Sequence, residues 1–407
     1  MNFICEIGSE FGFKAPKERI GRELSVQPER SDDEYLYVKI TRIFLLRILW
    51  YNWRDIKHPD AGGAEVFTHE IMRRLVNRGH QITLFTANFP NGNSEDNIDG
   101  VIIVREGGKY TVYNRARGYY EKNKSKFDLV IDESNTRPFL TPKFVKGKPL
   151  LALYHQLSRD GWFYEMPFPL NYIGYYYLEL KWLSYYKDVP TVTVSRSTRE
   201  DLERYGIKQI FMVPEGLNVT PLSEVKPKGA SPILVFMGRL KNHKLPDHAI
   251  KAFALIKKEI PDAQMWVLGD GYLRKRLENM AVKDVTFYGR VSNELKYDLL
   301  SKAHLMLMPG VREGWGLVVT EANSMGTPAV AYDIAGVRDS VVDGETGVLA
   351  RENSPEDLAR KALDLLRRPE FLNKLSVNAL SFSRKFSWDT TADRFEEVIG
   401  KVIALPA

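Results

Sequence analysis

Short apolar stretches alternate with stretches of helical period many times along the 407 residues, and this alternation constrains the fold more than any other feature. A strand followed by a helix and another strand is the unit of a parallel sheet covered by helices. Two series of such units occur, and residues 220–232, rich in Pro, Gly, Ser and Lys, separate them as an exposed linker would. The sequence therefore predicts an α/β protein with two Rossmann-like, doubly wound domains facing each other across a cleft.

The boundaries follow from the same pattern. We predict an N-terminal domain over residues 38–219 and a C-terminal domain over residues 220–387. Residues 1–37 show no clear period and are interpreted as an extension, expected to be flexible or an unusual start.

Composition excludes several classes of protein. Hydrophobic residues make up 44% of the chain, enough for two or three folded cores, so the protein is expected to be globular. A single cysteine excludes an internal disulfide, and no run approaches the roughly 18 uncharged apolar residues that span a bilayer. No signal peptide is recognised, and we expect a cytoplasmic protein. The net charge of +6 favours anionic partners, namely phosphates, nucleic acid or acidic lipid.

Two cations follow the first apolar run of the second series. Arg239 comes directly after Gly238, Lys244 comes five positions later, and a helix is predicted to begin near Pro246. Ligands bind beyond the carboxyl ends of strands in such sheets, and two cations at a helix entrance can hold a diphosphate. Two solvated basic residues on a loop are the alternative interpretation.

Two carboxylates flank the stretch WGLVVT. Gly316 lies near the start of a predicted helix, where the free N–H groups of Gly316, Leu317 and Val318 can bind a phosphate. Glu313 before the helix and Glu321 inside it can then accept hydrogen bonds from hydroxyl groups on either side of that phosphate. Ribose on one side and hexose on the other describe a nucleotide sugar. A loop charge and an exposed helix position are the alternative.

These residues together resemble a known family. Arg239 with Lys244, the stretch EGWGLVVTEA with its E-x(7)-E spacing, and AGGAE at residues 61–65 resemble the retaining glycosyltransferases of the family-four type (glycosyl transferases group 1), which have the GT-B fold. The resemblance runs from about residue 43 to the C-terminus and includes VPEGLN, GDGYLRKRLE, VTFYGRVSNEL and GETGVLA. The stretch NWRDIKHPDAGGAE is similar to a subgroup with an N-terminal NWRDxxHPxAGGAE motif.

The resemblance implies a hexosyltransferase. It would move a hexose, with retained configuration, from a nucleotide-diphosphate sugar to a hydroxyl of a glycan or lipid-linked acceptor. No cofactor and no essential metal are expected, because Arg239 and Lys244 would neutralise the leaving diphosphate. The N-terminal domain would bind the acceptor and the C-terminal domain the donor, and a last helix at about 388–407 would return to the N-terminal domain.

The family's functional residues carry over onto matching positions. Glu313 would bind hexose hydroxyls, Glu321 the ribose hydroxyls, and His155, at the end of a predicted strand, would lie near the anomeric carbon. The implied catalytic set is His155, Glu313, Arg239 and Lys244. Further donor-binding residues are Gly62, Gly63, Arg290, Val291, Gly316, Leu317 and Val318. The loop NWRDIKHP before Gly62 is suited to acceptor contact, and the predicted acceptor site consists of Arg54, Asp55 and His58. The chain departs from the family pattern at Leu245, where glycine is usual, and at Glu215, where asparagine is common.

Residues 161–188 are unusually aromatic, but charged residues interrupt them, which excludes a membrane span. One hypothesis is that this stretch forms a surface in peripheral contact with the anionic inner face of the cell membrane. Six lysines of the same domain would attract the acidic lipids. The alternative hypothesis is that the stretch forms a helix buried against the sheet of its own domain, with tyrosines at its rim. The lysines are Lys122, Lys124, Lys126, Lys143, Lys146 and Lys148.

Other functions stay open at this point. A GT-B phosphorylase or epimerase would bind phosphate with the same residues. A non-catalytic protein would use the basic surface for binding. No nucleic-acid partner is expected, because basic and aromatic residues form no known recognition motif. The sequence does not specify the nucleotide (UDP, GDP or ADP), the hexose, the acceptor, the linkage or the oligomeric state.

Overall fold

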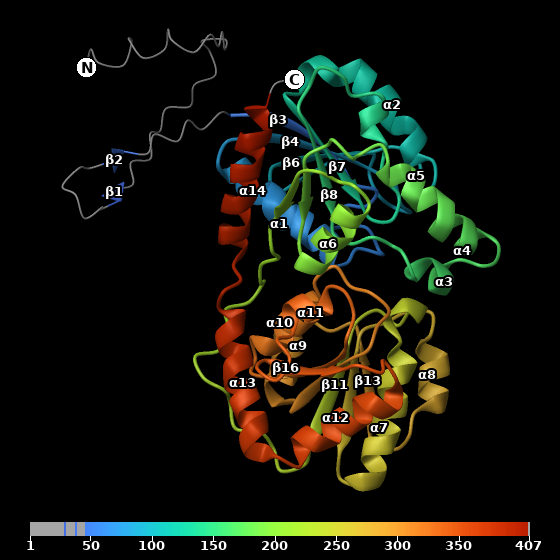
Figure 1. Cartoon of the computed structure of the whole chain (residues 1–407), viewed down its shortest axis with the longest axis vertical. Coiled ribbons are helices and arrows are strands. Elements are labelled where there is room, and N and C mark those ends of the chain that lie inside the picture. Colours follow the sequence, from blue (N-terminus) through green and yellow to red (C-terminus); the bar gives the residue numbers. More distant parts are fainter. Residues whose placement is uncertain (1–27, 30–36, 39–44, 406–407) are drawn as a thin grey trace.

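The computed structural model describes residues 28–29, 37–38 and 45–405. Figure 1 shows two α/β domains, one above the other, each built on its own sheet. This confirms the predicted architecture of two doubly wound domains. The predicted extension, residues 1–37, falls outside the described residues except where β1 (Pro28–Glu29) pairs antiparallel with β2 (Tyr37–Val38).

The N-terminal sheet has the strand order β10-β9-β8-β7-β3-β4-β6-β5. Strand β5 runs antiparallel to β6 at one edge, and the other neighbours are parallel. The strands are β3 (Arg47–Tyr51), β4 (Gln81–Thr86), β5 (Glu95–Ile98), β6 (Val101–Arg105), β7 (Leu129–Ser134), β8 (Leu150–Tyr154), β9 (Thr191–Thr193) and β10 (Ile210–Met212). The helices are α1 (Gly63–Asn77), α2 (Val112–Asn123), η1 (Lys124–Lys126), η2 (Thr141–Lys143), α3 (Gly161–Glu165), α4 (Leu170–Ile173), the π-helix η3 (Gly174–Leu178), α5 (Glu179–Leu183) and α6 (Arg196–Arg204).

The C-terminal sheet is parallel throughout, in the order β13-β12-β11-β14-β15-β16. Its strands are β11 (Ile233–Met237), β12 (Gln264–Leu268), β13 (Val285–Gly289), β14 (Leu305–Met308), β15 (Ala329–Tyr332) and β16 (Gly347–Ala350). Its helices are η4 (Asn242–Lys244), α7 (Pro246–Glu259), α8 (Arg274–Met280), α9 (Asn293–Lys302), α10 (Leu317–Asn323), α11 (Val337–Ser340), α12 (Pro355–Leu366) and α13 (Pro369–Ser383).

Both sheets place their first parallel strand in the middle, because the chain winds to one side of it and then to the other. Strand β11 lies between β12 and β14, and β3 lies between β4 and β7. Loops that follow such central strands diverge and leave a crevice at the carboxyl edge of the sheet, which is where ligands of open α/β sheets bind. The segments after β3 and β11 therefore occupy the positions best suited to a site.

The last helix, α14 (Trp388–Ile403), returns from the C-terminal domain to the N-terminal one and lies along α1 (Figure 1). Its apolar face joins the N-terminal core, where the Phe395 ring stacks on Trp50 with centroids 5.3 Å apart. At the crossing, Trp388 donates its Nε1–H to Asn218 at 2.6 Å. The helix thus couples the two domains through buried contacts rather than through a surface strap.

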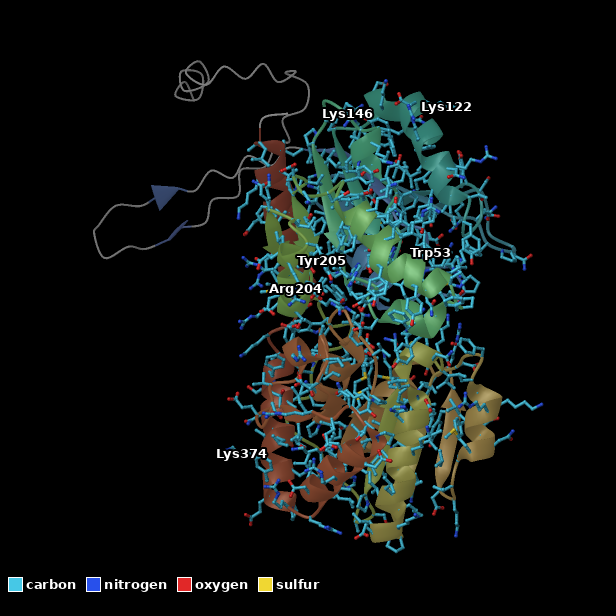
Figure 2. All side chains as sticks on the ribbon, turned by 45° about the vertical axis from the view of Figure 1, so that its right-hand side comes forward. Trp53, Lys122, Lys146, Arg204, Tyr205 and Lys374 are labelled. Carbon is cyan, nitrogen blue, oxygen red and sulfur yellow. The ribbon has the colours of Figure 1, made fainter. Side chains whose placement is uncertain are left out.

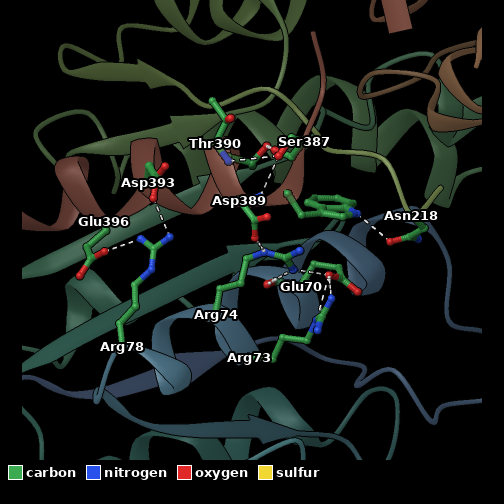
Figure 3. A network of polar contacts seen from close by, with 12 residues as sticks. Glu70, Arg73, Arg74, Arg78, Asn218, Ser387, Asp389, Thr390, Asp393 and Glu396 are labelled. Carbon is green, nitrogen blue, oxygen red and sulfur yellow. Dashed lines mark hydrogen bonds and ion pairs between the residues drawn. The ribbon is translucent and has the colours of Figure 1, made fainter. Parts of the chain in front are cut away.

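Arg74 of α1 and Arg78, which follows α1, also hold α14 by ion pairs, which Figure 3 shows. Arg74 pairs with Asp389 at 2.6 Å, and Arg78 pairs with both Asp393 at 2.6 Å and Glu396 at 2.5 Å.

Replacing Arg78 by alanine is expected to lower the free energy of unfolding by about 1 kcal/mol, because the pairs it forms are partly exposed to water. Urea titration measures the loss, which should shrink in high salt as the pairs are screened. The matched control is Arg394→Ala, an exposed arginine of α14 that has no ion-pair partner in the described part of the chain. Equal stability of the two variants would contradict this role of Arg78.

Candidate active site between the domains

A buried polar cluster lies at the carboxyl edge of the N-terminal sheet. His155, directly after β8, is 5% exposed and its Nε2 lies 3.2 Å from the Glu133 carboxylate. On the other side of the ring, Nδ1 lies 3.8 Å from Oε1 of Glu215, which is an ion-pair distance. Burial lowers the pKa of His155, but the two carboxylates outweigh it and raise the pKa to about 9. His155 is therefore a fixed imidazolium at neutral pH.

Glu133 was missed by the sequence analysis. It lies in β7, is fully buried, and its carboxylate is saturated with donors. The other donors are Trp50 Nε1 at 2.8 Å, Asn52 Nδ2 at 2.8 Å and Thr68 Oγ1 at 2.6 Å. The one available signal was a carboxylate at the end of an apolar strand, in the stretch DLVIDES. Its partners lie 65 to 83 positions away in sequence, so only the fold brings them together.

The predicted cations of the C-terminal domain lie at its edge facing this cluster. Lys244 forms an ion pair with Glu313, and both side chains are largely buried. The guanidinium carbon of Arg239 lies 3.7 Å from where a β-carbon on Gly62 would stand, so it faces the start of α1 in the other domain. In the described part of the chain its guanidinium has no hydrogen-bond or ion-pair partner. Arg239 is thus an uncompensated cation at the domain boundary.

The loop that carries Glu313 packs directly on His155. A β-carbon on Gly314 would lie 2.8 Å from the carbonyl oxygen of His155, so this approach requires glycine. Gly316 begins α10 with φ of +91°, a conformation that glycine adopts without strain. Leu317, the first residue of α10, lies 3.2 Å from the position of a β-carbon on Gly63. Gly62 and Gly63 of the N-terminal domain therefore lie against Arg239 and Leu317 of the C-terminal domain.

Glu321 lies on α10, about one and a half turns inside the helix. Its carboxylate pairs with Lys296 at 2.6 Å and accepts the Tyr297 hydroxyl at 3.1 Å. These two partners come from α9 and fix the carboxylate beside the helix start. Of the neighbouring predicted donor residues, Val318 and Val291 are partly buried against the C-terminal core, while Arg290 is exposed and donates to the Pro59 carbonyl at 3.3 Å.

The three predicted acceptor residues have different surroundings in the structure. Arg54 pairs with Glu65 at 2.8 Å and packs over the Trp53 ring. His58 is half-buried, and burial lowers its pKa. Asp55 is 2% exposed and forms a buried pair with Arg105 at 2.7 Å.

Asp55 thus holds its own loop through this ion pair, and its contact with an acceptor stays a prediction. The partner, Arg105, lies 50 positions away on β6, so the local sequence does not indicate the pair. Buried charges require such partners, because an unpaired one is costly to desolvate.

The aromatic stretch, residues 161–188, contacts the C-terminal domain beside the predicted cations. Glu165 of α3 pairs with His243 of η4, directly beside Lys244. A cavity of about 260 Å³ lies here, lined from the N-terminal domain by Phe163 and Tyr164 and from the other by Leu273 and Leu277 among others. Within the described residues, no group of three or more His, Cys, Asp or Glu side chains is placed to hold a metal ion.

The aromatic surface is our term for eight exposed side chains of α3, α4, η3 and the segment between α3 and α4. None of residues 166–178 is charged. Trp162, Leu183 and Tyr186 of the same stretch are buried, so the segment has one face against the domain and one face in water. The eight side chains are Phe163, Tyr164, Phe168, Leu170, Tyr172, Ile173, Tyr176 and Tyr177.

Comparison with known proteins shows which family the chain resembles. Residues 61–220 match the family described as Glycosyltransferase Family 4, and residues 222–382 match Glycosyl transferases group 1. An uncharacterized glycosyltransferase of Methanocaldococcus jannaschii is 30% identical over 202 residues, which are 49% of this chain and 55% of that protein. The D-inositol 3-phosphate glycosyltransferase of Streptomyces scabiei is 30% identical over 41% of this chain and 40% of its own length. The chain thus spans about half the length of these curated relatives.

Among solved structures, sucrose-phosphate synthase from Thermosynechococcus elongatus superposes with a TM-score of 0.74 at 19% identity, over 88% of this chain and 99% of that one. The Anabaena protein HepE, solved in complex with UDP-glucose, superposes with a TM-score of 0.67 at 15% identity, over 88% of this chain and all of the other. These likenesses show the GT-B fold. With one family match on each domain, the chain belongs to the GT-B glycosyltransferases of the family-four type.

Proposed function

We propose that this protein transfers a hexose from a nucleotide-diphosphate sugar to a hydroxyl of a glycan or lipid-linked acceptor, with retained configuration and without a metal ion. The observation that carries the proposal is the meeting of Arg239 and the Lys244–Glu313 pair with His155 at the domain boundary. The UDP-glucose bound to the structural neighbour HepE supports a nucleotide sugar as the donor.

In the proposed reaction the bond between hexose C1 and the β-phosphate oxygen breaks, and the acceptor oxygen bonds to C1 on the same face. The acceptor's proton passes to an oxygen of the departing diphosphate, so no side-chain nucleophile takes part. Arg239 and Lys244 stabilise the negative charge that develops on the leaving group, and the buried setting strengthens their effect. The imidazolium of His155 is neutralised by its two flanking carboxylates, so it does not oppose positive charge at C1.

A thermal-shift screen tests the donor site and the metal independence together. UDP-glucose, GDP-mannose and ADP-glucose are each added to the purified protein with and without EDTA. A ligand at a hundredfold excess over its Kd stabilises the folded state by about 2.7 kcal/mol, which raises the midpoint by a few degrees. We expect one nucleotide to give this shift with EDTA present, and Glu321→Ala to abolish it.

The control for that variant is Glu345→Ala, an exposed glutamate of the same domain. A shift that requires a divalent ion would contradict metal independence. The absence of any shift would contradict the donor site.

We also propose peripheral contact of the N-terminal domain with an anionic membrane at the inner face of a cytoplasmic membrane. None of the helices in the described part of the chain is both long and apolar enough to cross a membrane. The support is the aromatic surface, since exposed aromatic rings suit the interface of a bilayer. Figure 2 shows Lys122 and Lys146 at the end of the domain away from the C-terminal domain. The Nζ of Lys143, in contrast, lies 4.2 Å from the ring centroid of Tyr185 in the aromatic stretch.

Removing two aromatic side chains of this surface tests the membrane contact. Phe168 and Tyr176 are among its most exposed members, and the variant Phe168→Ser with Tyr176→Ser is expected to bind vesicles of phosphatidylcholine and phosphatidylglycerol about tenfold more weakly. Flotation measures the bound fraction. Tyr110→Ser is the matched control, because Tyr110 is as exposed but lies outside the aromatic surface. Absence of binding by the unmodified protein would refute the proposal.

A further inference from the structure

Glu215 stands at the junction between the domains, in the stretch VPEGLN that follows β10. Its side chain is 5% exposed, yet its carboxylate accepts no hydrogen bond from any donor in the described part of the chain. The nearest cationic atom is Nδ1 of His155 at 3.8 Å, which is too long for a hydrogen bond. Nδ1 itself also lacks a hydrogen-bond partner within the described residues. The acceptor capacity of the Glu215 carboxylate is therefore not taken up by a donor from the described residues, and the facing Nδ1 of His155 is a fully buried polar atom without a partner among them.

The neighbouring Glu133 is a carboxylate with a purely structural role and serves as a comparison for Glu215. Glu133 is equally buried but holds three donors besides His155, so it has no capacity left for a ligand. Burial raises the pKa of Glu215; His155 and Lys244 oppose this rise, and Glu313 adds to it. Glu215 therefore lies beside His155 and interacts electrostatically with the Lys244–Glu313 pair of the other domain.

The charge of Glu215 decides what it can bind. A carboxylate repels the phosphates of a nucleotide sugar and attracts hydroxyl groups, which can donate hydrogen bonds to it. In the proposed function the ribose hydroxyls bind Glu321 on α10, and the acceptor hydroxyl gives its proton to the diphosphate. The hydroxyls left beside His155 and Glu313 are then those of the transferred sugar. An asparagine in its place would offer one acceptor oxygen and no charge.

We infer that the Glu215 carboxylate is a binding group for a hydroxyl of the transferred hexose, and that it favours neutral sugars over uronic acids. This inference rests on the proposed function, since it places the hexose of the donor between His155 and Glu313. The hydroxyl fills the acceptor capacity that the protein leaves open. A uronic acid would bring a second carboxylate into the same buried space and be rejected by repulsion.

Calorimetry with matched ligand pairs tests the inference. The binding of UDP and UDP-glucose, GDP and GDP-mannose, and ADP and ADP-glucose is measured, and the pair bound by the unmodified protein is taken further. We expect the sugar nucleotide to bind the unmodified protein more tightly than its diphosphate does. Glu215→Leu should lower the ratio of these two affinities about tenfold and leave the affinity for the diphosphate unchanged. Glu215→Gln should lose less, because its amide oxygen still accepts. Glu397→Gln, an exposed glutamate of α14, is the control.

A monodeoxy analogue of the sugar nucleotide sharpens the test. The analogue that lacks the hydroxyl bound by Glu215 should bind the unmodified protein more weakly than the full sugar nucleotide does. Glu215→Leu should bind the analogue and the full sugar nucleotide equally well. If Glu215→Leu does not fold, the same comparison is made with Glu215→Gln. An unchanged sugar preference in both variants would overturn the inference and leave the proposed function standing. Failure of the unmodified protein to bind any of the six ligands would overturn both.

Discussion

Lys244→Ala is expected to lower kcat/KM for sugar transfer at least 100-fold while the protein remains folded. Loss of one preorganised group that stabilises developing charge costs about 100- to 1000-fold in rate. Lys244 ends η4, immediately before α7, and its ammonium group pairs with Glu313 across the loop that packs on His155. Its removal takes away a cation from the leaving group and also leaves Glu313 without its partner.

The measurement is the release of nucleoside diphosphate from the donor found in the thermal-shift screen. Circular dichroism and urea titration show whether the variant is folded, and the unpaired Glu313 should cost about 2 kcal/mol of stability. Lys251→Ala is the matched control, because Lys251 lies on α7 with the same charge but pairs with Asp247 on the surface. Turnover by Lys244→Ala equal to that of this control would refute the assignment.

The fold was open to prediction because its signal is local. Each strand of a buried parallel sheet is a short apolar run, and each covering helix has its own period, so the number of domains and their class follow from the pattern. The GT-B arrangement is confirmed on both domains. The antiparallel edge strand β5, with the sequence EDNI, carries no such apolar run and was not recognised.

The site was less open to prediction because its contacts are not local. Arg239, Lys244, Glu313 and Glu321 stand after strands or at helix starts, where position alone suggests a ligand role. Their assignment as donor residues stays a prediction, although the structure brings the first three to the domain boundary.

Residues whose role depends on a distant partner behave differently. The role of Glu133 is recognised only once Trp50 and Asn52 lie beside it in the fold. The ion pair of Asp55 could not be predicted, because Arg105 comes from a later strand. Local sequence reports where a carboxylate stands along an element, whereas its charge compensation is a property of the folded chain.

The stability of the protein is expected to depend on pH through His155. Its pKa is 6.5 in the unfolded chain and about 9 in the folded one, because Glu133 and Glu215 hold the proton more strongly than burial repels it. A pKa that rises on folding adds stability that is fully present below pH 6.5 and is lost as pH rises through 9. The shift corresponds to about 3 kcal/mol of unfolding free energy.

The test compares the unmodified protein with His155→Gln by urea titration from about pH 6 to about pH 10. The difference in unfolding free energy between them should fall by about 3 kcal/mol across this range. The comparison matters because Lys228, whose pKa burial lowers to about 8, gives the opposite slope above that pH, and this slope cancels between the two proteins.

If His155→Gln does not fold, the imidazole signals of the unmodified protein give the same answer by NMR. His155 should keep its proton to about pH 9, unlike His58 and His248, whose pKa values burial lowers below 6.5. Parallel pH profiles of the two proteins, or no histidine titrating above pH 8, would show that the two carboxylates do not hold the proton. The cation beside the proposed reaction centre would then be absent at neutral pH, and His155 could act there only as a neutral ring.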